Sequence, residues 1–181
     1  MMRASIITMY FVTILMVVSC TNHKGSVTGL EAPDSTGEAL IEQQKEMLKV
    51  ESNDIDAYIT RSGLNMQTTK TGLRYMIHHS GLSKDSIRPM DEVNIEYKVF
   101  LLNGDLVYSS DSTGSLRLII GRSELATGLQ EGLQLMKTGD NGLLILPSHL
   151  AYGLTGDGDK ISGFQPLVIQ INSVQKLYGD K

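Results

Sequence analysis

The sequence predicts an α+β fold, with one short helix packed against an antiparallel β-sheet and a helical arm ahead of the sheet. Three observations support this prediction. Apolar residues follow helical spacing before residue 63, they alternate with polar residues from residue 64 onward, and a further helical pattern lies at 125–137. With 181 residues, of which 41% are hydrophobic and 20% charged, the chain is long enough for one domain with accessory segments.

The composition excludes several classes of function. The 16 Lys and Arg residues against 20 Asp and Glu give a formal net charge of −4, so we expect no nucleic-acid partner. One cysteine and four histidines leave no cysteine-based zinc site and no disulfide framework.

Residues 1–19 have the pattern of a signal peptide. Arg3 precedes an apolar run at 6–18, which is too short for a membrane-spanning helix of roughly 20 residues. The run ends at Ser19 and Cys20, and this junction resembles a bacterial lipobox. The resemblance implies that the signal is removed and that Cys20 is acylated, so that its acyl chains insert into the lipid bilayer. The alternative is an ordinary signal peptide followed by an incidental cysteine.

Residues 20–35 are rich in Gly, Ser and Thr, so we expect a flexible tether after the lipidated cysteine. No acidic residue follows Cys20 directly, which by resemblance to known sorting rules favours the outer membrane. We therefore expect a protein that is lipid-anchored in the bacterial cell envelope and faces the periplasm.

Residues 36–63 form the predicted helical arm. Its apolar side chains recur at spacings near multiples of 3.6 residues, and Gly63 is suited to end a helix. The residues at 52–54 favour helix starts, so two helices with a break there are an alternative. The arm is a candidate for homodimer contacts or for holding a client. The alternative is a helix that covers the domain or acts as a spacer.

The β region begins with a leading strand and loop at 64–88, in which the strand occupies 73–77. Asn103-Gly104 predicts a tight hairpin. His78-His79 and the segment 155–160, which holds two carboxylates, are interpreted as surface histidines and a solvated turn rather than as metal sites. Further strands are predicted at 93–99, 106–108, 116–120, 142–146 and 166–174, with the helix at 125–137 between them.

An ordered series of motifs runs through residues 89–178. In chain order it contains Pro89-Met90-Asp91, Tyr97, Leu102-Asn103-Gly104, Tyr108-Ser109-Ser110, Gly121, the segment 128–132, Met136, Gly139-Asp140, Pro147, Ala151-Tyr152-Gly153 and Leu167-Val168. This series resembles the FKBP-type peptidyl-prolyl cis-trans isomerase domain. The lipobox, the arm and residues 66–75 further resemble envelope lipoprotein members of the family, including those associated with gliding motility.

The resemblance implies a bent antiparallel sheet wrapped around one short helix, with an apolar pocket between them. It also implies isomerase (rotamase) activity on proline-containing polypeptide clients, in the folding of cell-envelope proteins. The X–Pro amide has nearly isoenergetic cis and trans forms separated by a barrier of ~18–20 kcal/mol. A site that binds the twisted amide better than either planar form lowers this barrier without a cofactor.

The family pattern assigns roles to nine residues by resemblance. Tyr97, Tyr108 and Tyr152 would be the catalytic residues, and the hydroxyl of Tyr152 would donate a hydrogen bond to a substrate carbonyl. Ala126 would donate its backbone N–H to the bound peptide. The substrate-binding residues would be Leu118, Leu125, Ala126, Leu129, Ile161 and Ile169.

Three residues depart from the family pattern. Leu129 stands where the family usually has Trp, Ser109 where it has Asp, and Ala126 is smaller than the usual Ile. Positions 118, 129 and 169 also lack the usual aromatic rings, each of which buries about 150–250 Å². We therefore expect reduced isomerase activity. The alternative is a non-catalytic interaction module or chaperone that binds an envelope partner through the groove or the arm.

Overall fold

The computed structural model describes residues 35–80 and 83–178 of the chain. The predicted signal peptide, Cys20 and almost all of the tether lie outside the described residues. The chain divides into two units, one ending at Ile41 and the other beginning at Glu42. The contacts described below belong to the second unit. Among the described helices, none is both long and apolar enough to cross a membrane.

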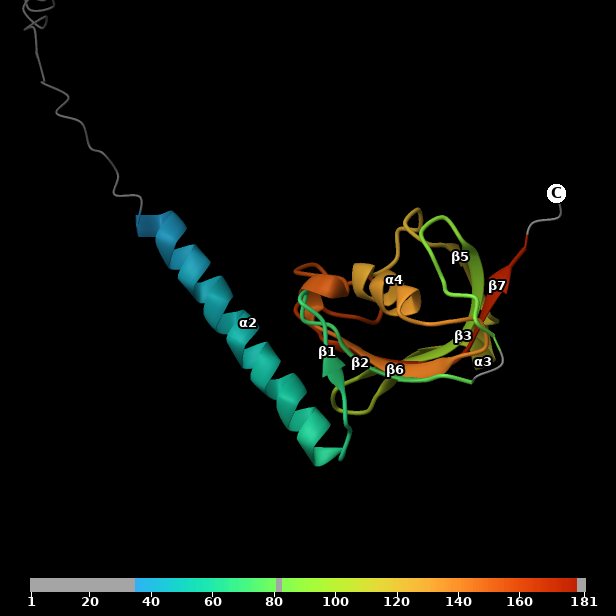
Figure 1. Ribbon diagram of the computed structural model, residues 1–181. Helices are drawn as coiled ribbons and strands as arrows, with labels where there is room; N and C mark the ends of the chain where they lie inside the picture. The colour runs from blue at the N-terminus through green and yellow to red at the C-terminus, as the bar shows by residue number, and fades with distance from the viewer. Residues whose placement is uncertain (1–34, 81–82, 179–181) are drawn as a thin grey trace, which may run out of the picture. The chain divides into compact units, whose positions relative to one another are not determined.

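The predicted arm is one continuous helix, α2 (Ser35–Arg61) (Figure 1). The alternative of a break at 52–54 is wrong. Ser52 accepts a hydrogen bond from Arg74 (Nη2 to Oγ, 2.9 Å). Its hydroxyl therefore binds a side chain of the sheet and does not cap the start of a second helix. After α2 the chain turns at Ser62 and Gly63.

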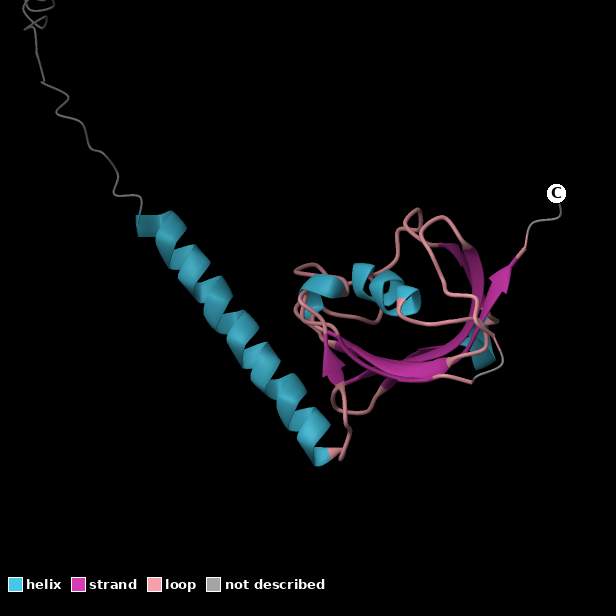
Figure 2. Ribbon diagram, in the orientation of Figure 1, coloured by secondary structure: helices cyan, strands magenta, loops and turns pink. Residues whose placement is uncertain are grey.

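Seven strands form one antiparallel sheet in the order β1-β2-β6-β7-β3-β4, with β5 paired to β3. Figure 2 shows the strands in magenta. The strands are β1 (Gln67–Thr68), β2 (Arg74–His78), β3 (Glu92–Leu101), β4 (Leu106–Ser109), β5 (Leu116–Ile119), β6 (Asn141–Leu146) and β7 (Leu167–Leu177). The predicted antiparallel fold is confirmed, and the observed strands begin and end within a few residues of the predicted ones. The hairpin at Asn103-Gly104 joins β3 to β4, with Gly104 at a positive φ of 95°.

One face of the sheet packs against α4 (Thr127–Gln134), which crosses it in Figure 1. The two glycines of α4 allow this close approach. A Cβ at Gly132 would lie 2.4 Å from Leu144 Cδ1, and one at Gly128 would lie 2.7 Å from Leu146 Cγ. The helix is shorter than predicted, and it starts later because Ala126, with φ −42° and ψ 124°, has the non-helical backbone of a residue that precedes a helix.

The opposite face of the sheet packs against α2. Ile55 of α2 is fully buried with Ile145 of β6 and Val168 of β7, and Tyr58 and Ile59 lie at the edge of this cluster. Because side chains alternate along a strand, Leu144 and Ile145 point to opposite faces, and both are fully buried. The sheet therefore has apolar packing on both faces.

Three short elements were not predicted from the sequence. They are β1, the single-turn helix α3 (Ser110–Thr113) and the 3-10 helix η1 (Ser148–Leu150). Each is only two to four residues long, too short for apolar periodicity to reveal. The last of them, η1, leads directly into the segment that holds Tyr152.

Candidate functional site

A small enclosed cavity of about 110 Å³ lies between the sheet and α4. Its lining is almost wholly apolar, apart from three tyrosines. The lining residues are Tyr97, Val99, Tyr108, Leu116, Leu125, Ala126, Leu129, Tyr152, Ile161, Leu167 and Ile169. Of the nine predicted site residues, the structure thus brings eight together around one cavity.

The three tyrosines come from different elements. Tyr97 is on β3, Tyr108 is on β4, and Tyr152 follows η1. Within the described residues, the Tyr152 hydroxyl makes no hydrogen bond, although the residue is only partly exposed. Burial, together with the negative charge of Asp157, raises the pKa of Tyr152 above its ordinary value. The hydroxyl is therefore a protonated donor with no competing acceptor in this part of the chain.

The start of α4 forms one side of the cavity. Leu125 and Ala126 precede the helix, and Leu129 follows in its first turn with its backbone N–H donated to the Ala126 carbonyl at 3.1 Å. Gln130 Nε2 donates to the carbonyl of Leu125 at 3.1 Å and so fixes the segment before the helix. The floor of the cavity at Leu129 is thus held by backbone geometry and is aliphatic.

The loop after Tyr152 is held closed by Asp157. Its Oδ1 accepts the backbone N–H groups of Asp159 (2.9 Å) and Ile161 (2.8 Å), while its own N–H donates to the Ile161 carbonyl at 3.0 Å. Gly156 is required just before it, because a Cβ there would lie 2.0 Å from the Ile161 carbonyl oxygen and its φ is +74°. This turn places Ile161 in the lining of the cavity.

Asp157 also joins the loop to β4. Its Oδ2 accepts a hydrogen bond from the Tyr108 hydroxyl, and Lys160 Nζ lies 5.0 Å from the centroid of the Tyr108 ring. This hydrogen bond, with burial and the nearby carboxylate charge, raises the pKa of Tyr108 far above its ordinary value. Burial opposes ionisation of Asp157, but the hydrogen bonds from Tyr108 and the loop N–H groups outweigh it and lower the pKa of Asp157.

The interpretation of 155–160 as a solvated turn is therefore wrong for Asp157, which is a structural partner of a pocket tyrosine. Two carboxylates in a Gly-rich loop were the only sequence signal, and they do not reveal a partner 49 residues away. In the described part of the chain, no group of three or more His, Cys, Asp or Glu residues could hold a metal ion.

Leu118 is the one predicted pocket residue that does not line the cavity. It is buried in the core, and Leu116, two residues earlier on β5, takes its place in the lining. Because residues i and i+2 of a strand share a face, the prediction chose the correct face and the wrong position along it. The sequence also missed Val99 and Leu167, whose ordinary strand patterns gave no sign of a cavity.

Two further residues have structural partners. Ser109, one of the departures, is buried and caps the start of α3, where its Oγ accepts the Asp111 N–H at 3.1 Å. His79, interpreted as a surface histidine, has an exposed ring but contacts Asp140 (Nδ1 to Oδ2, 2.6 Å). Asp140 is almost fully buried and also accepts the backbone N–H of Lys137 at 2.9 Å.

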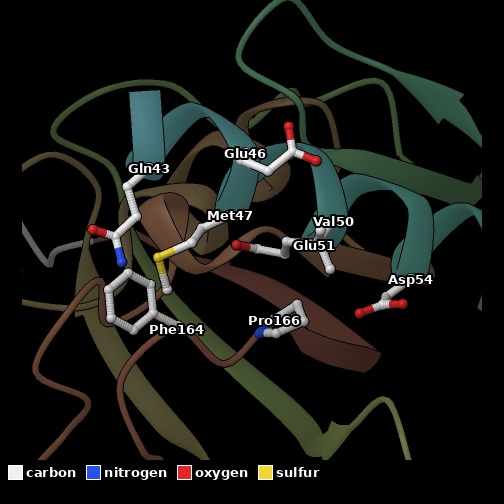
Figure 3. A pocket seen from close by; sticks show the side chains of 8 residues that line it. All are labelled: Gln43, Glu46, Met47, Val50, Glu51, Asp54, Phe164 and Pro166. Carbon is white, nitrogen blue, oxygen red and sulfur yellow. The ribbon is translucent and has the colours of Figure 1, made fainter. Parts of the chain in front are cut away.

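Larger cavities lie elsewhere on the second unit. One of about 350 Å³ lies beside α2, and Figure 3 shows Met47 and Val50 of the helix facing Phe164 and Pro166 across it. It is an open surface groove without a tyrosine hydroxyl. The enclosed cavity with three tyrosines is therefore the better candidate for a site that acts on a peptide.

Comparison with known proteins gives a consistent result. A family model described as FKBP-type peptidyl-prolyl cis-trans isomerase matches residues 83–173. A probable FKBP-type peptidyl-prolyl cis-trans isomerase, FkpA, of Neisseria meningitidis is 31% identical over 137 residues, which cover 75% of this chain and 50% of that protein. A second probable isomerase of this type, from Haemophilus influenzae, is 31% identical over 109 residues, covering 60% of this chain and 44% of that protein.

The fold is also found among solved structures. The crystal structure of FkpA from Escherichia coli aligns with a TM-score of 0.59 and 23% identity, over 98% of this chain and 82% of that one. The chain spans about half the length of the two curated relatives named above.

Proposed function

Because the chain belongs to the FKBP-type peptidyl-prolyl cis-trans isomerase family, we propose that it accelerates cis-trans rotation of X–Pro bonds in polypeptides. The observation that carries this proposal is the Tyr152 hydroxyl, which lies at an enclosed apolar cavity and has no partner among the described residues. A donor left without a partner in such a place is suited to bind the carbonyl of a bound peptide.

Rotation about a prolyl amide breaks no covalent bond, so the site needs no nucleophile or general base. The twisted amide loses its C–N double-bond character and much of its dipole, and an apolar cavity therefore favours it over the planar forms. Each ~1.4 kcal/mol of selective stabilisation raises the rate tenfold. Tyr152 would hold the peptide, and the rings of Tyr97 and Tyr108 would surround the rotating bond.

We propose that the activity is reduced relative to a pocket with an aromatic floor. Leu116, Leu129 and Ile169 line the cavity with aliphatic side chains, so fewer rings contact the prolyl group. The same observation favours the second candidate, a non-catalytic module or chaperone that binds an envelope partner.

An isomerisation assay on a Leu-Pro or Phe-Pro peptide separates the two candidates. Spontaneous isomerisation takes tens to hundreds of seconds, so even a weak enzyme gives a measurable acceleration. We expect the full-length chain to accelerate the reaction and Tyr152→Phe to lower kcat/KM about tenfold, the value of one hydrogen bond. A rate equal to the uncatalysed one at high protein concentration would contradict the isomerase and favour the binding module.

We propose that Cys20 is acylated and anchors the protein in the cell envelope, in the outer membrane facing the periplasm. The support is the sequence pattern at Ser19-Cys20 after the apolar run at 6–18. Two or more acyl chains suffice for stable membrane binding. Cys20→Ser should move the protein from the membrane fraction to the soluble fraction, and unchanged retention in the membrane would rule out the anchor.

We propose that the arm forms homodimer contacts. Met47, Leu48 and Val50 are each at least 40% exposed on α2, which is unusual for three neighbouring apolar residues. Burying them against a second copy would remove this surface from water. Sedimentation should give a dimer that Val50→Glu converts to a monomer, with Glu46→Ala as the control on the same helix. A monomer at all concentrations would contradict this proposal.

A further inference from the structure

Glu51 is a buried carboxylate on the exposed arm helix. It is 9% exposed, whereas the side chains of Glu42 and Glu46 on the same helix are 76% and 65% exposed. One carboxylate oxygen accepts the backbone N–H of Ser148, and the other accepts the Ser148 Oγ hydrogen at 2.6 Å. A carboxylate is costly to bury unless its oxygens are hydrogen-bonded, so the position of Ser148 is tightly set by Glu51.

Ser148 in turn holds the two residues that flank Tyr152. Its carbonyl oxygen accepts the backbone N–H of Ala151 at 3.0 Å and that of Gly153 at 2.8 Å. Glu51 thus fixes the first residue of η1, and that residue fixes the turn that carries the pocket tyrosine. The connection runs from the arm to the cavity through one serine.

The sheet determines where Glu51 lies. Ile55, one helical turn later, is fully buried against the sheet, and Arg74 of β2 donates to Ser52 Oγ at 2.9 Å and Asp56 Oδ1 at 3.1 Å. Residues four apart share a helix face, so Glu51 lies on the packed face of α2. Figure 3 shows its side chain among the residues that line the groove beside the helix.

We propose that Glu51 is a positioning residue for Tyr152, through which the arm sets the geometry of the pocket. This rests on the proposed isomerase function. A pocket that works by selective binding depends on donor placement, and a displacement of about 1 Å can cost up to about 100-fold in rate. Loss of the Glu51 contacts would free the turn after Pro147 and displace the Tyr152 hydroxyl.

Three variants of the full-length chain test the proposal. Glu51→Ala removes both acceptors and should lower kcat/KM about tenfold. Glu51→Gln keeps one carbonyl acceptor for the Ser148 N–H and offers an amide donor to its hydroxyl, so it should restore kcat/KM to within about threefold of wild type. Glu46→Ala makes the same change at an exposed position of the same helix and should leave kcat/KM unchanged. All assays run below the thermal midpoint of every variant.

A double-mutant cycle separates positioning from general destabilisation. In a Tyr152→Phe background, Glu51→Ala should cost little further activity, because the hydroxyl that it positions is gone. An equal loss in both backgrounds, or full activity of folded Glu51→Ala, would overturn the proposal.

A readout without substrate keeps this test independent of the isomerase proposal. The ring resonances of Tyr152, assigned by NMR, should shift in Glu51→Ala and remain in place in Glu51→Gln and Glu46→Ala. An inactive wild type whose Tyr152 signals respond in this way would refute the isomerase and retain the positioning role. An active wild type whose Tyr152 signals do not respond would refute the positioning role alone.

Discussion

The two faces of the sheet are built from the same strands but differ in what covers them. The face against α4 carries the larger buried cluster, and it encloses the cavity with the three tyrosines. The face against α2 buries only Ile55, Ile145 and Val168 completely, with partly exposed residues around them. The face against α4 therefore supplies the pocket and most of the buried apolar surface that stabilises the fold. The face against α2 holds that helix in place, while other apolar residues of α2 stay exposed.

Adjacent residues of β6 offer the most direct test of this difference. Leu144→Ala and Ile145→Ala each remove a fully buried side chain, so each should lower the free energy of unfolding by about 2–5 kcal/mol. Leu144→Ala should cost more, because its cavity opens in the larger cluster beside Gly132. Urea unfolding of the two variants checks the order. Equal losses would mean that the two faces contribute alike, and a greater loss for Ile145→Ala would mean that the face against α2 contributes more.

Within the face against α4, the aliphatic floor of the cavity can be replaced by an aromatic one. Leu129→Trp should raise kcat/KM about tenfold if ring contacts supply ~1.4 kcal/mol to the twisted amide. Peptide isomerisation measures the gain, and Lys45→Trp at an exposed position of α2 is the control for an added tryptophan away from the cavity. An unchanged or lower rate in a folded Leu129→Trp variant would show that the floor does not limit turnover.

Asp140 is the residue immediately before β6, the strand that carries Leu144 and Ile145. Burial opposes its ionisation, but hydrogen bonds from His79, Lys137 N–H and Ser80 N–H outweigh it, so its pKa is lower in the folded protein than the ordinary 3.8. Its contribution to stability is thus complete above the unfolded pKa and is lost as the pH falls through the folded pKa.

The free energy of unfolding should therefore fall more steeply below about pH 4 in the wild type than in Asp140→Asn. Urea unfolding at a series of pH values measures the difference between the two chains, which removes the contribution of the other carboxylates. Parallel pH profiles would show that Asp140 does not contribute to the acid sensitivity.

The smallest expected effect is a change in the titration of Tyr108, whose hydroxyl binds Asp157 in the loop that closes the cavity. The hydrogen bond to Asp157 raises the pKa of Tyr108 above its ordinary value, so the Tyr108 phenolate should form at a higher pH than that of a tyrosine without such a bond. The chain has no tryptophan, which makes phenolate absorbance simple to follow. Asp157→Asn should lower the pKa of Tyr108, so that its phenolate forms at a lower pH than in the wild type. An unchanged titration curve would show that this hydrogen bond does not form in solution.

The sequence was sufficient for features that depend on short stretches of chain. Alternation at 93–99 predicted β3, Asn103-Gly104 predicted the hairpin, and the ordered motifs at 89–178 led to eight of the nine predicted site residues that meet at the cavity. Helical spacing predicted α2 but not its continuity. The residues at 52–54, which favour helix starts, suggested a break. In the structure, Ser52 instead accepts a hydrogen bond from Arg74 in the middle of one continuous helix.

By itself, then, the sequence determined which residues are apolar, which face of each element they occupy and in what order the elements follow. Only the tertiary structure decided that Leu116 and not Leu118 lines the cavity, that Asp157 pairs with Tyr108 and that Glu51 binds Ser148, 97 residues later. Periodicity along a helix or strand predicts which side chains of that element share a face. The partner that a side chain meets depends on strand register and on how distant segments pack, and local pattern does not encode either one.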